Sequence, residues 1–349
     1  LMPLRTVSLS ERIMIGKTFP AVLAGWTLLA AVAAGATSAA EDTKLIEKFK
    51  LRNGLTVVIR ENHSSPVVAV QVWVKAGSSS EQEKLAGMSH ILEHMAFKGT
   101  KKRGPGQIAR EVEALGGEIN AYTSFDQTVY HITISKRYLE NALEILSDTL
   151  GNSVFDPGEL AREKEVILEE LRMNEDDPGR IVWKALFREA YRVHPYGRPV
   201  IGYADTIRKT GRKDLVSYFS KHYHPGNMVL LIVGDVDPKA ARPLIEKTFL
   251  PLRSRALAKK KTPAEPPQKG IRVKIQEWDA KRAYLEIGFP GPSMRSKDVF
   301  AFDLFSSILG DGETSRLYRE VKDRKGLVDS VGAGSYTPKD PGLLMVRAR

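Results

Sequence analysis

Two valine-rich segments constrain the architecture of this chain more than any other feature. Residues 55–62 (LTVVIREN) and 67–77 (VVAVQVWVKAG) combine branched apolar residues with partial alternation, which predicts β-strands. Helical patterns follow at residues 87–100 and 106–117, and residues 117–135 predict two further strands around a turn. Strand pairs separated by helices are typical of an α+β domain with a mainly antiparallel sheet.

Further helices and one more strand extend this first domain. The helices are expected at residues 137–150, 157–178, about 180–192, 212–222 and from Pro238, and the strand at residues 227–236. From Ile271 the order starts again, with strands at IRVKIQEW and AYLEIGF and a helix at VFAFDLFSSIL. This order loosely echoes residues 45–97. We therefore predict duplicated α+β domains, the second truncated, because the chain stops within the strand-like segment GLLMVRAR.

A basic segment separates the two predicted domains. Residues 253–270 contain prolines and almost no large apolar side chains, which is typical of an exposed linker. The predicted domains are therefore residues 41–252 and residues 271–349. The second domain is expected to be incomplete.

Residues 1–40 have the pattern of a secretory signal peptide. Arg5, Arg12 and Lys17 precede an uncharged apolar run at residues 19–36, and small residues follow it up to Ala40. Cleavage near Ala40 would give an exported protein, which in a bacterium is periplasmic. The alternative is an uncleaved membrane anchor, because the run approaches the ~20 residues that a membrane span needs.

Composition excludes several kinds of chemistry. The 349 residues include no cysteine, so disulfides, thiolate metal sites and cysteine nucleophiles are absent, and any metal must be held by nitrogen and oxygen. The net charge is +11, but much of it lies in residues 1–40 and in the linker. No basic segment is interleaved with stacking aromatic residues, which argues against a nucleic-acid surface.

The sequence His90-Ile91-Leu92-Glu93-His94 is the strongest chemical signal. Residues four apart lie on one helix face, so both imidazoles can reach one ion, and Glu93 borders that face. Two imidazoles and one carboxylate form a common catalytic zinc set, with a nearby carboxylate as base. The pattern is the reverse of the better-known zincin motif. A plain helix with two histidines remains the alternative until a third ligand is found.

The helix at residues 157–178 offers that ligand. Glu163 and Glu170 are seven residues apart and therefore lie on one face, whereas Glu169 is displaced by about 100° from Glu170. An ordinary solvated acidic helix would show the same composition. Spacing alone therefore leaves open which glutamate binds a metal.

Several other segments of the chain support a family resemblance beyond the histidine motif. Glu170 follows His94 by 76 residues, and the chain also contains FKGT, GGEINAYTS, TVYHI, HPYGRPVIG and GDGETSRLYREV. From about residue 45 onward the chain resembles the pitrilysin-type, inverted-zincin metallopeptidases, which include mitochondrial processing peptidase and insulin-degrading enzyme. The resemblance implies that His90, His94 and Glu170 bind Zn²⁺ and that Glu93 is the general base.

The same resemblance implies two further roles. Glu163 would orient a histidine ligand from behind. Asn120, Ala121 and Tyr122 would form an edge strand that binds peptide substrate by β-augmentation, although Asn120 alone could equally be a turn residue. His131 and His194 resemble scaffold positions and are assigned no metal.

One departure from the family pattern concerns residues 321–333 (VKDRKGLVDSVGA). Active single-chain relatives carry an arginine and a tyrosine that flank the GL pair, and Lys322 and Asp329 stand at these positions here. Lysine lacks the planar fork of arginine, and aspartate removes a phenol donor. The resemblance therefore favours a heterodimer with a homologous zinc-less subunit that supplies the arginine and tyrosine, over a homodimer.

The sequence thus predicts a zinc-dependent endopeptidase that hydrolyses unfolded peptides or short polypeptides. One alternative is a non-catalytic structural or assembly subunit of the same fold. Another is a peptidase that matures one peptide-derived product. The presence of His90, Glu93, His94 and Glu170 favours the enzyme over the non-catalytic subunit, since subunits of that kind usually lose motif residues.

Overall fold

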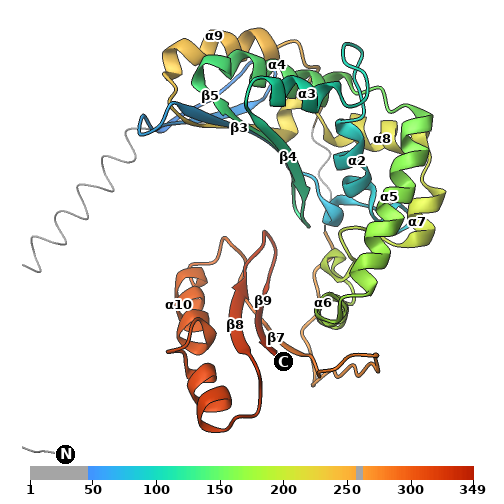
Figure 1. The fold of residues 1–349 in the computed structure, drawn as a ribbon, viewed down its shortest axis with the longest axis vertical. Coiled ribbons are helices and arrows are strands. Elements are labelled where there is room, and N and C mark those ends of the chain that lie inside the picture. The colour runs from blue at the N-terminus through green and yellow to red at the C-terminus, as the bar shows by residue number, and fades with distance from the viewer. Residues whose placement is uncertain (1–45, 257–261) are drawn as a thin grey trace, which may run out of the picture. The chain divides into compact units, whose positions relative to one another are not determined.

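The computed structural model describes residues 46–256 and 262–349 (Figure 1). The predicted signal peptide and the middle of the predicted linker, residues 257–261, lie outside the described residues. None of the helices in the two described ranges is both long and apolar enough to span a membrane.

A six-stranded sheet forms the centre of the first domain. Its order is β1-β2-β6-β3-β5-β4, with β2 and β6 parallel and with β6-β3, β3-β5 and β5-β4 antiparallel. The strands are β1 (Ile46–Lys50), β2 (Thr56–Glu61), β3 (Val67–Val74), β4 (Glu118–Thr123), β5 (Thr128–Ser135) and β6 (Met228–Gly234). This sheet confirms the predicted mainly antiparallel α+β class. Because β4 is an edge strand, one side of its backbone has no neighbouring strand in the sheet.

The alternation of buried and partly exposed residues along β3 shows which face of the sheet packs against helices. Val68, Val70, Val72 and Val74 are fully buried, while the residues between them are partly exposed. Helices α4 and α9 pack against each other, and α4 contacts β3 and β5. The main apolar core therefore lies between this sheet face and its covering helices.

The helices of the first domain largely follow the sequence patterns. They are α2 (Met88–Ala96), α3 (Gln107–Ala114), α4 (Leu139–Asn152), α5 (Pro157–Glu175), α6 (Pro178–Ala190), α7 (Ala204–Lys209), α8 (Arg212–His222) and α9 (Pro238–Phe249). Short 3-10 turns cover Ser78–Ser80, Glu83–Leu85, Lys136–Tyr138, Pro195–Gly197 and Pro225–Asn227. The long helix expected to reach residue 178 ends at Glu175 instead. Pro178 starts α6, and the Asp177 side chain accepts hydrogen bonds from the first backbone N–H groups of that helix.

Residues from Leu285 onward form a second, smaller sheet. Its order is β7 (Leu285–Pro290), β9 (Leu343–Ala348) and β8 (Val331–Tyr336), all antiparallel, and α10 (Val299–Gly310) contacts β8. A π-helical turn, η6, covers Tyr318–Arg324. The strands predicted at AYLEIGF and GLLMVRAR and the helix at VFAFDLFSSIL are confirmed. The domain boundaries themselves stay a prediction.

The strand predicted at residues 271–278 (IRVKIQEW) is wrong. This segment has no regular structure, and Ile271, Val273 and Ile275 are 93%, 74% and 83% exposed. A strand is stabilised by hydrogen bonds to a neighbouring strand, and no described strand pairs with this segment. The local pattern was strand-like, but the fold supplies no partner for it.

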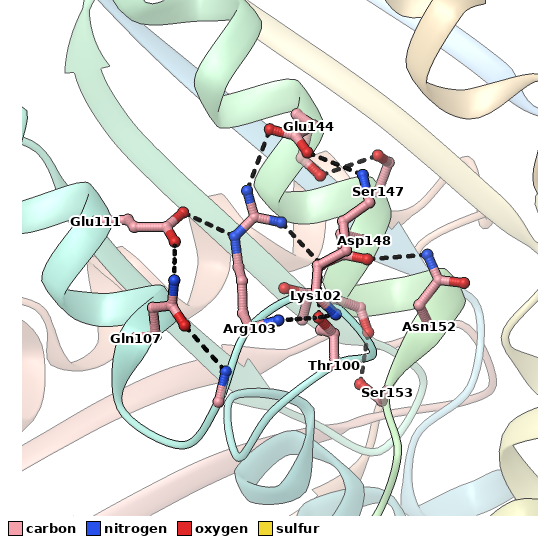
Figure 2. A network of polar contacts seen from close by, with 12 residues as sticks. Thr100, Lys102, Arg103, Gln107, Glu111, Glu144, Ser147, Asp148, Asn152 and Ser153 are labelled. Atoms are coloured by element: carbon pink, nitrogen blue, oxygen red, sulfur yellow. Dashed lines mark hydrogen bonds and ion pairs between the residues drawn. The ribbon is translucent and has the colours of Figure 1, made fainter.

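A buried charge network holds the loop that follows α2 (Figure 2). Arg103 is 7% exposed and donates to Asp148 at 2.8 Å, Glu111 at 2.7 Å and Glu144 at 3.1 Å. The Thr100 hydroxyl also donates to Asp148 at 2.6 Å. Burial alone would raise the pKa of Asp148, but these hydrogen bonds outweigh it and lower the pKa. The network joins the loop to α3 and α4.

Arg103→Ala is expected to lower the free energy of unfolding by about 3 kcal/mol, because it leaves the buried Asp148 carboxylate without its charged partner. Lys102→Ala is the matched control. Lys102 is an exposed partner of Glu144, and its loss should cost less than about 1 kcal/mol. Urea unfolding followed by circular dichroism measures both. Equal decreases in the free energy of unfolding for the two variants would contradict the proposed stabilising role of Arg103.

The same network gives a pH dependence. The lowered pKa of Asp148 means that its stabilisation is complete above the ordinary value of 3.8 and is lost as the pH falls through the lower folded value. The free energy of unfolding of Arg103→Ala should therefore fall less than that of the unmodified protein when the pH is lowered through this range.

Candidate metal centre and active site

Helix α2 places the two motif histidines close together on one of its sides. It starts after Gly87, whose φ of 94° favours glycine, and buries Ile91, Leu92 and Met95 in the core. Because that apolar face is fixed, His90 and His94 both lie on the other side, with ring centroids 4.8 Å apart.

Glu170 of α5 completes a three-residue group. Its Oε2 lies 3.6 Å from His90 Nε2 and 3.9 Å from His94 Nε2. One ligand atom from each residue lies within 4.8 Å of the others. Helices α2 and α5 contact each other directly (Figure 1). Two imidazole nitrogens and one carboxylate oxygen are a donor set that suits Zn²⁺, so the residues present fit that ion.

The structure distinguishes the glutamates that spacing left open. Glu169 is 61% exposed and pairs with Arg172 on its own helix, away from the histidines. Glu163 lies behind His94, with Oε2 3.0 Å from Nδ1 and Oε1 2.6 Å from Lys98 Nζ. An Nδ1–H donor to Glu163 leaves the His94 Nε2 lone pair directed toward Glu170.

Burial keeps the His90 ring neutral. Burial, helped by the neighbouring His94, lowers the pKa of His90 to about 3. A neutral imidazole is the form that binds metals, so His90 is ready to ligate over the whole physiological pH range.

Glu93 lies on the same helix beside this group. Its Oε2 accepts a hydrogen bond from the Thr123 hydroxyl of β4 at 2.5 Å. Burial raises the pKa of Glu93 despite that hydrogen bond, and the Glu170 carboxylate adds to the rise. A raised pKa suits a carboxylate that must accept and return a proton near neutral pH.

Glu81 fixes the start of α2 and was missed in the sequence analysis. Its buried carboxylate accepts hydrogen bonds from the backbone N–H groups of Gly87 at 2.8 Å and Ser89 at 2.7 Å. The Ser89 hydroxyl in turn lies 2.9 Å from the Tyr218 hydroxyl of α8. Burial raises the pKa of Glu81 to about 7. These bonds satisfy N–H groups that a helix start leaves free, and thereby fix the position of the residue next to His90.

A cavity of about 1000 Å³ opens beside the metal group. His90, Glu93 and Glu170 line it, together with Tyr122 and Thr123 of β4 and one side of α6. The catalytic candidates therefore share one cavity with an exposed sheet edge.

Comparison with known proteins places these features in a family. Residues 56–204 match insulinase (peptidase family M16), and residues 210–349 match the peptidase M16 inactive domain. Zinc protease PqqE of Helicobacter pylori is 33% identical over 306 residues, covering 86% of this chain and 68% of that protein. The chain belongs to the insulinase family of peptidases.

Other members agree with this assignment. A mitochondrial-processing peptidase subunit beta of Lentinula edodes is 35% identical over 269 residues, covering 76% of this chain and 58% of that protein. The crystal structure of a protease from Helicobacter pylori has a TM-score of 0.82 at 33% identity, covering 87% of this chain and 74% of that one. Pitrilysin shares the fold, with a TM-score of 0.72 at 19% identity over 87% of this chain and 33% of that one. The resemblance to pitrilysin-type peptidases is thereby confirmed, and the zinc proteases among the relatives confirm Zn²⁺ as the cofactor.

The three residues predicted to bind peptide lie on the edge strand of this insulinase-family domain. Asn120, Ala121 and Tyr122 belong to β4, and Tyr122 is 43% exposed and packs edge-on against Trp73. Asn120 pairs with His131 within the sheet and is therefore a strand residue, not a turn residue.

Lys322 and Asp329 occupy the second half of the chain. Lys322 lies in η6 and donates to the Tyr318 hydroxyl at 3.2 Å, with its ammonium 4.5 Å from the centre of that ring. Asp329 is exposed and pairs with Arg282 at 3.0 Å. Each of these side chains therefore has a local partner.

Proposed function

We propose that this chain is a zinc-dependent endopeptidase that cleaves unfolded peptides or short polypeptides. One observation carries the proposal: the donor atoms of His90, His94 and Glu170 converge beside Glu93 in a cavity that is open to the edge strand β4. In this proposal His90, His94 and Glu170 are the metal ligands.

Glu93 acts as the general base in the proposed reaction. Bound Zn²⁺ supplies Lewis-acid chemistry, lowering the pKa of a water molecule toward about 7 and polarising a carbonyl. Glu93 takes the proton of the attacking water and gives it to the leaving amine. The Thr123 hydroxyl holds the Glu93 carboxylate in place, and Glu163 holds the His94 ring.

The edge strand β4 is the proposed binding surface for the peptide. An extended segment adds to an unpaired strand edge through backbone hydrogen bonds, which explains a requirement for unfolded substrates. Asn120, Ala121 and Tyr122 would then contact the substrate backbone and side chains. Thr123, the next residue, donates a hydrogen bond to Glu93. A peptide bound along this edge would therefore lie close to the proposed general base.

The alternative of a non-catalytic subunit fits the site less well. A subunit that serves only assembly has no need for three converging metal-binding donors beside a carboxylate that Thr123 holds in place. We further propose that the enzyme is exported, on the basis of residues 1–40, and that its working form is a heterodimer with a zinc-less homologue.

Metal removal tests the proposed function. Dialysis against a chelator should abolish cleavage of a quenched fluorescent peptide by the active assembly, and about one equivalent of Zn²⁺ should restore it. The three proposed ligands belong to one site, so the metal content should follow the activity in a single step. Cleavage that persists after complete removal of the metal would contradict the proposal.

A further inference from the structure

One face of α6 carries a row of cations into the cavity of the proposed active site. Arg180, Lys184 and Arg188 are spaced four residues apart, so they lie along one side of the helix. All three line the same cavity as His90, Glu93 and Glu170, and Lys274 lines it as well. The spacing of these cations in the sequence alone predicted no role for them.

Packing of α6 fixes the direction of this row. Trp183, Leu186 and Phe187 join a second apolar cluster with Phe125 and Tyr196. This face is about 100° away from the line of cations around the helix axis. The row therefore lies beside the packed side of the helix and along the cavity, and its side chains are also accessible to solvent.

The positive charge of the row is partly compensated by neighbouring residues. Arg180 lies 3.5 Å from the Asp177 carboxylate and donates a hydrogen bond to the Asn174 side chain. Besides Glu93 and Glu170, the acidic residues that line the cavity are Glu175 and Glu189. Glu189 pairs with Arg192 at 2.5 Å, and Glu175 lies 4.0 Å from Lys184, both near the surface. Among the described residues Arg188 has no ion pair and no side-chain hydrogen bond, although many other surface arginines of the chain have one.

We propose that Arg180, Lys184 and Arg188 form a subsite for an acidic side chain of the peptide, close to the scissile bond. The inference rests on the proposed peptidase function and adds a substrate class to it. Guanidinium groups bind carboxylates through two parallel hydrogen bonds, and an ammonium group adds a further positive charge. A basic side chain in the same place would be repelled.

Peptide binding measures this preference without turnover. Zinc-loaded Glu93→Gln protein is titrated with fluorescent peptides of one sequence that carry Asp, Asn or Lys at each position in turn. At one or two positions we expect Asp to bind about tenfold more tightly than Lys, since each exposed ion pair contributes only modestly. High salt should reduce this difference.

Charge reversal provides the decisive comparison. Arg180→Glu with Lys184→Glu should invert the preference, so that the Lys peptide binds more tightly than the Asp peptide at the same position. Arg188→Glu alone, a milder change at an exposed residue, should shift the ratio in the same direction. Lys213→Glu with Lys239→Glu is the matched control, because it changes the net charge equally at exposed residues that do not line the cavity.

Three results would overturn the subsite: equal affinities for Asp and Lys peptides at every position, no binding of any peptide, or the same shift in the control variant as in the reversed one. Hydrolysis by the unmodified chain assembled with a zinc-less homologous subunit is measured separately. Its absence would contradict the proposed function, whereas hydrolysis without an acidic preference would contradict the subsite alone.

Discussion

Glu93→Gln is expected to retain its zinc and to lose about 10²–10⁴-fold or more of its peptide hydrolysis. The amide has nearly the shape of the carboxylate but cannot accept a proton from water. Glu93 is not one of the three converging ligands, so its replacement leaves His90, His94 and Glu170 in place. The Thr123 hydroxyl can still donate to the amide oxygen, which keeps the side chain in position.

Zinc content and cleavage rate must be measured on the same samples, with His90→Ala as the comparison. That variant removes a ligand and should lose metal and activity together, whereas Glu93→Gln should lose activity alone. Near-normal turnover of Glu93→Gln at full zinc occupancy would exclude Glu93 as the base. Stoichiometric zinc in His90→Ala would exclude His90 as a ligand.

Most of the first domain could be predicted from local patterns, because its elements bury one face each. The alternating valines of β3 and the apolar side of α2 are examples in which the periodicity of the sequence matches burial in the structure. Residues 271–278 show the limit of this reasoning. Their pattern is that of a strand, but strand formation depends on a partner, and pairing between distant segments cannot be read from the segment itself.

The candidate site likewise contains features that the sequence predicted and features that only the structure shows. Four-residue spacing places His90 and His94 on one face, but only the packing of α5 against α2 brings Glu170, and not Glu169, to their nitrogens. Glu81 was missed because it caps α2 from outside the helix and across a turn. The row of cations on α6 was missed because a cavity between separate elements gives no signal in any one of them.

A full-length form of this chain is expected to be nearly inactive by itself, even with its zinc bound. The family resemblance implies that Lys322 and Asp329 stand where active single-chain relatives carry an arginine and a tyrosine. Both side chains have local partners, Tyr318 and Arg282. An aspartate cannot donate a hydrogen bond to a developing oxyanion, and a lysine cannot form a two-point contact with it. The loss of one such donor costs ~10²–10³-fold in rate, and here two are missing.

A homologous zinc-less subunit that carries both residues should restore cleavage in proportion to the heterodimer formed. The assay compares zinc-loaded full-length protein alone, over a range of concentrations, with the same protein titrated by the partner. Lys322→Arg with Asp329→Tyr is the matched variant in cis, and it should recover part of the activity where the chain associates with itself. A rate that rises with the partner and saturates near one equivalent would support two half-sites on different chains. Robust turnover of the unmodified chain without a partner would mean that Lys322 and Asp329 suffice, and the proposed heterodimer would then be wrong.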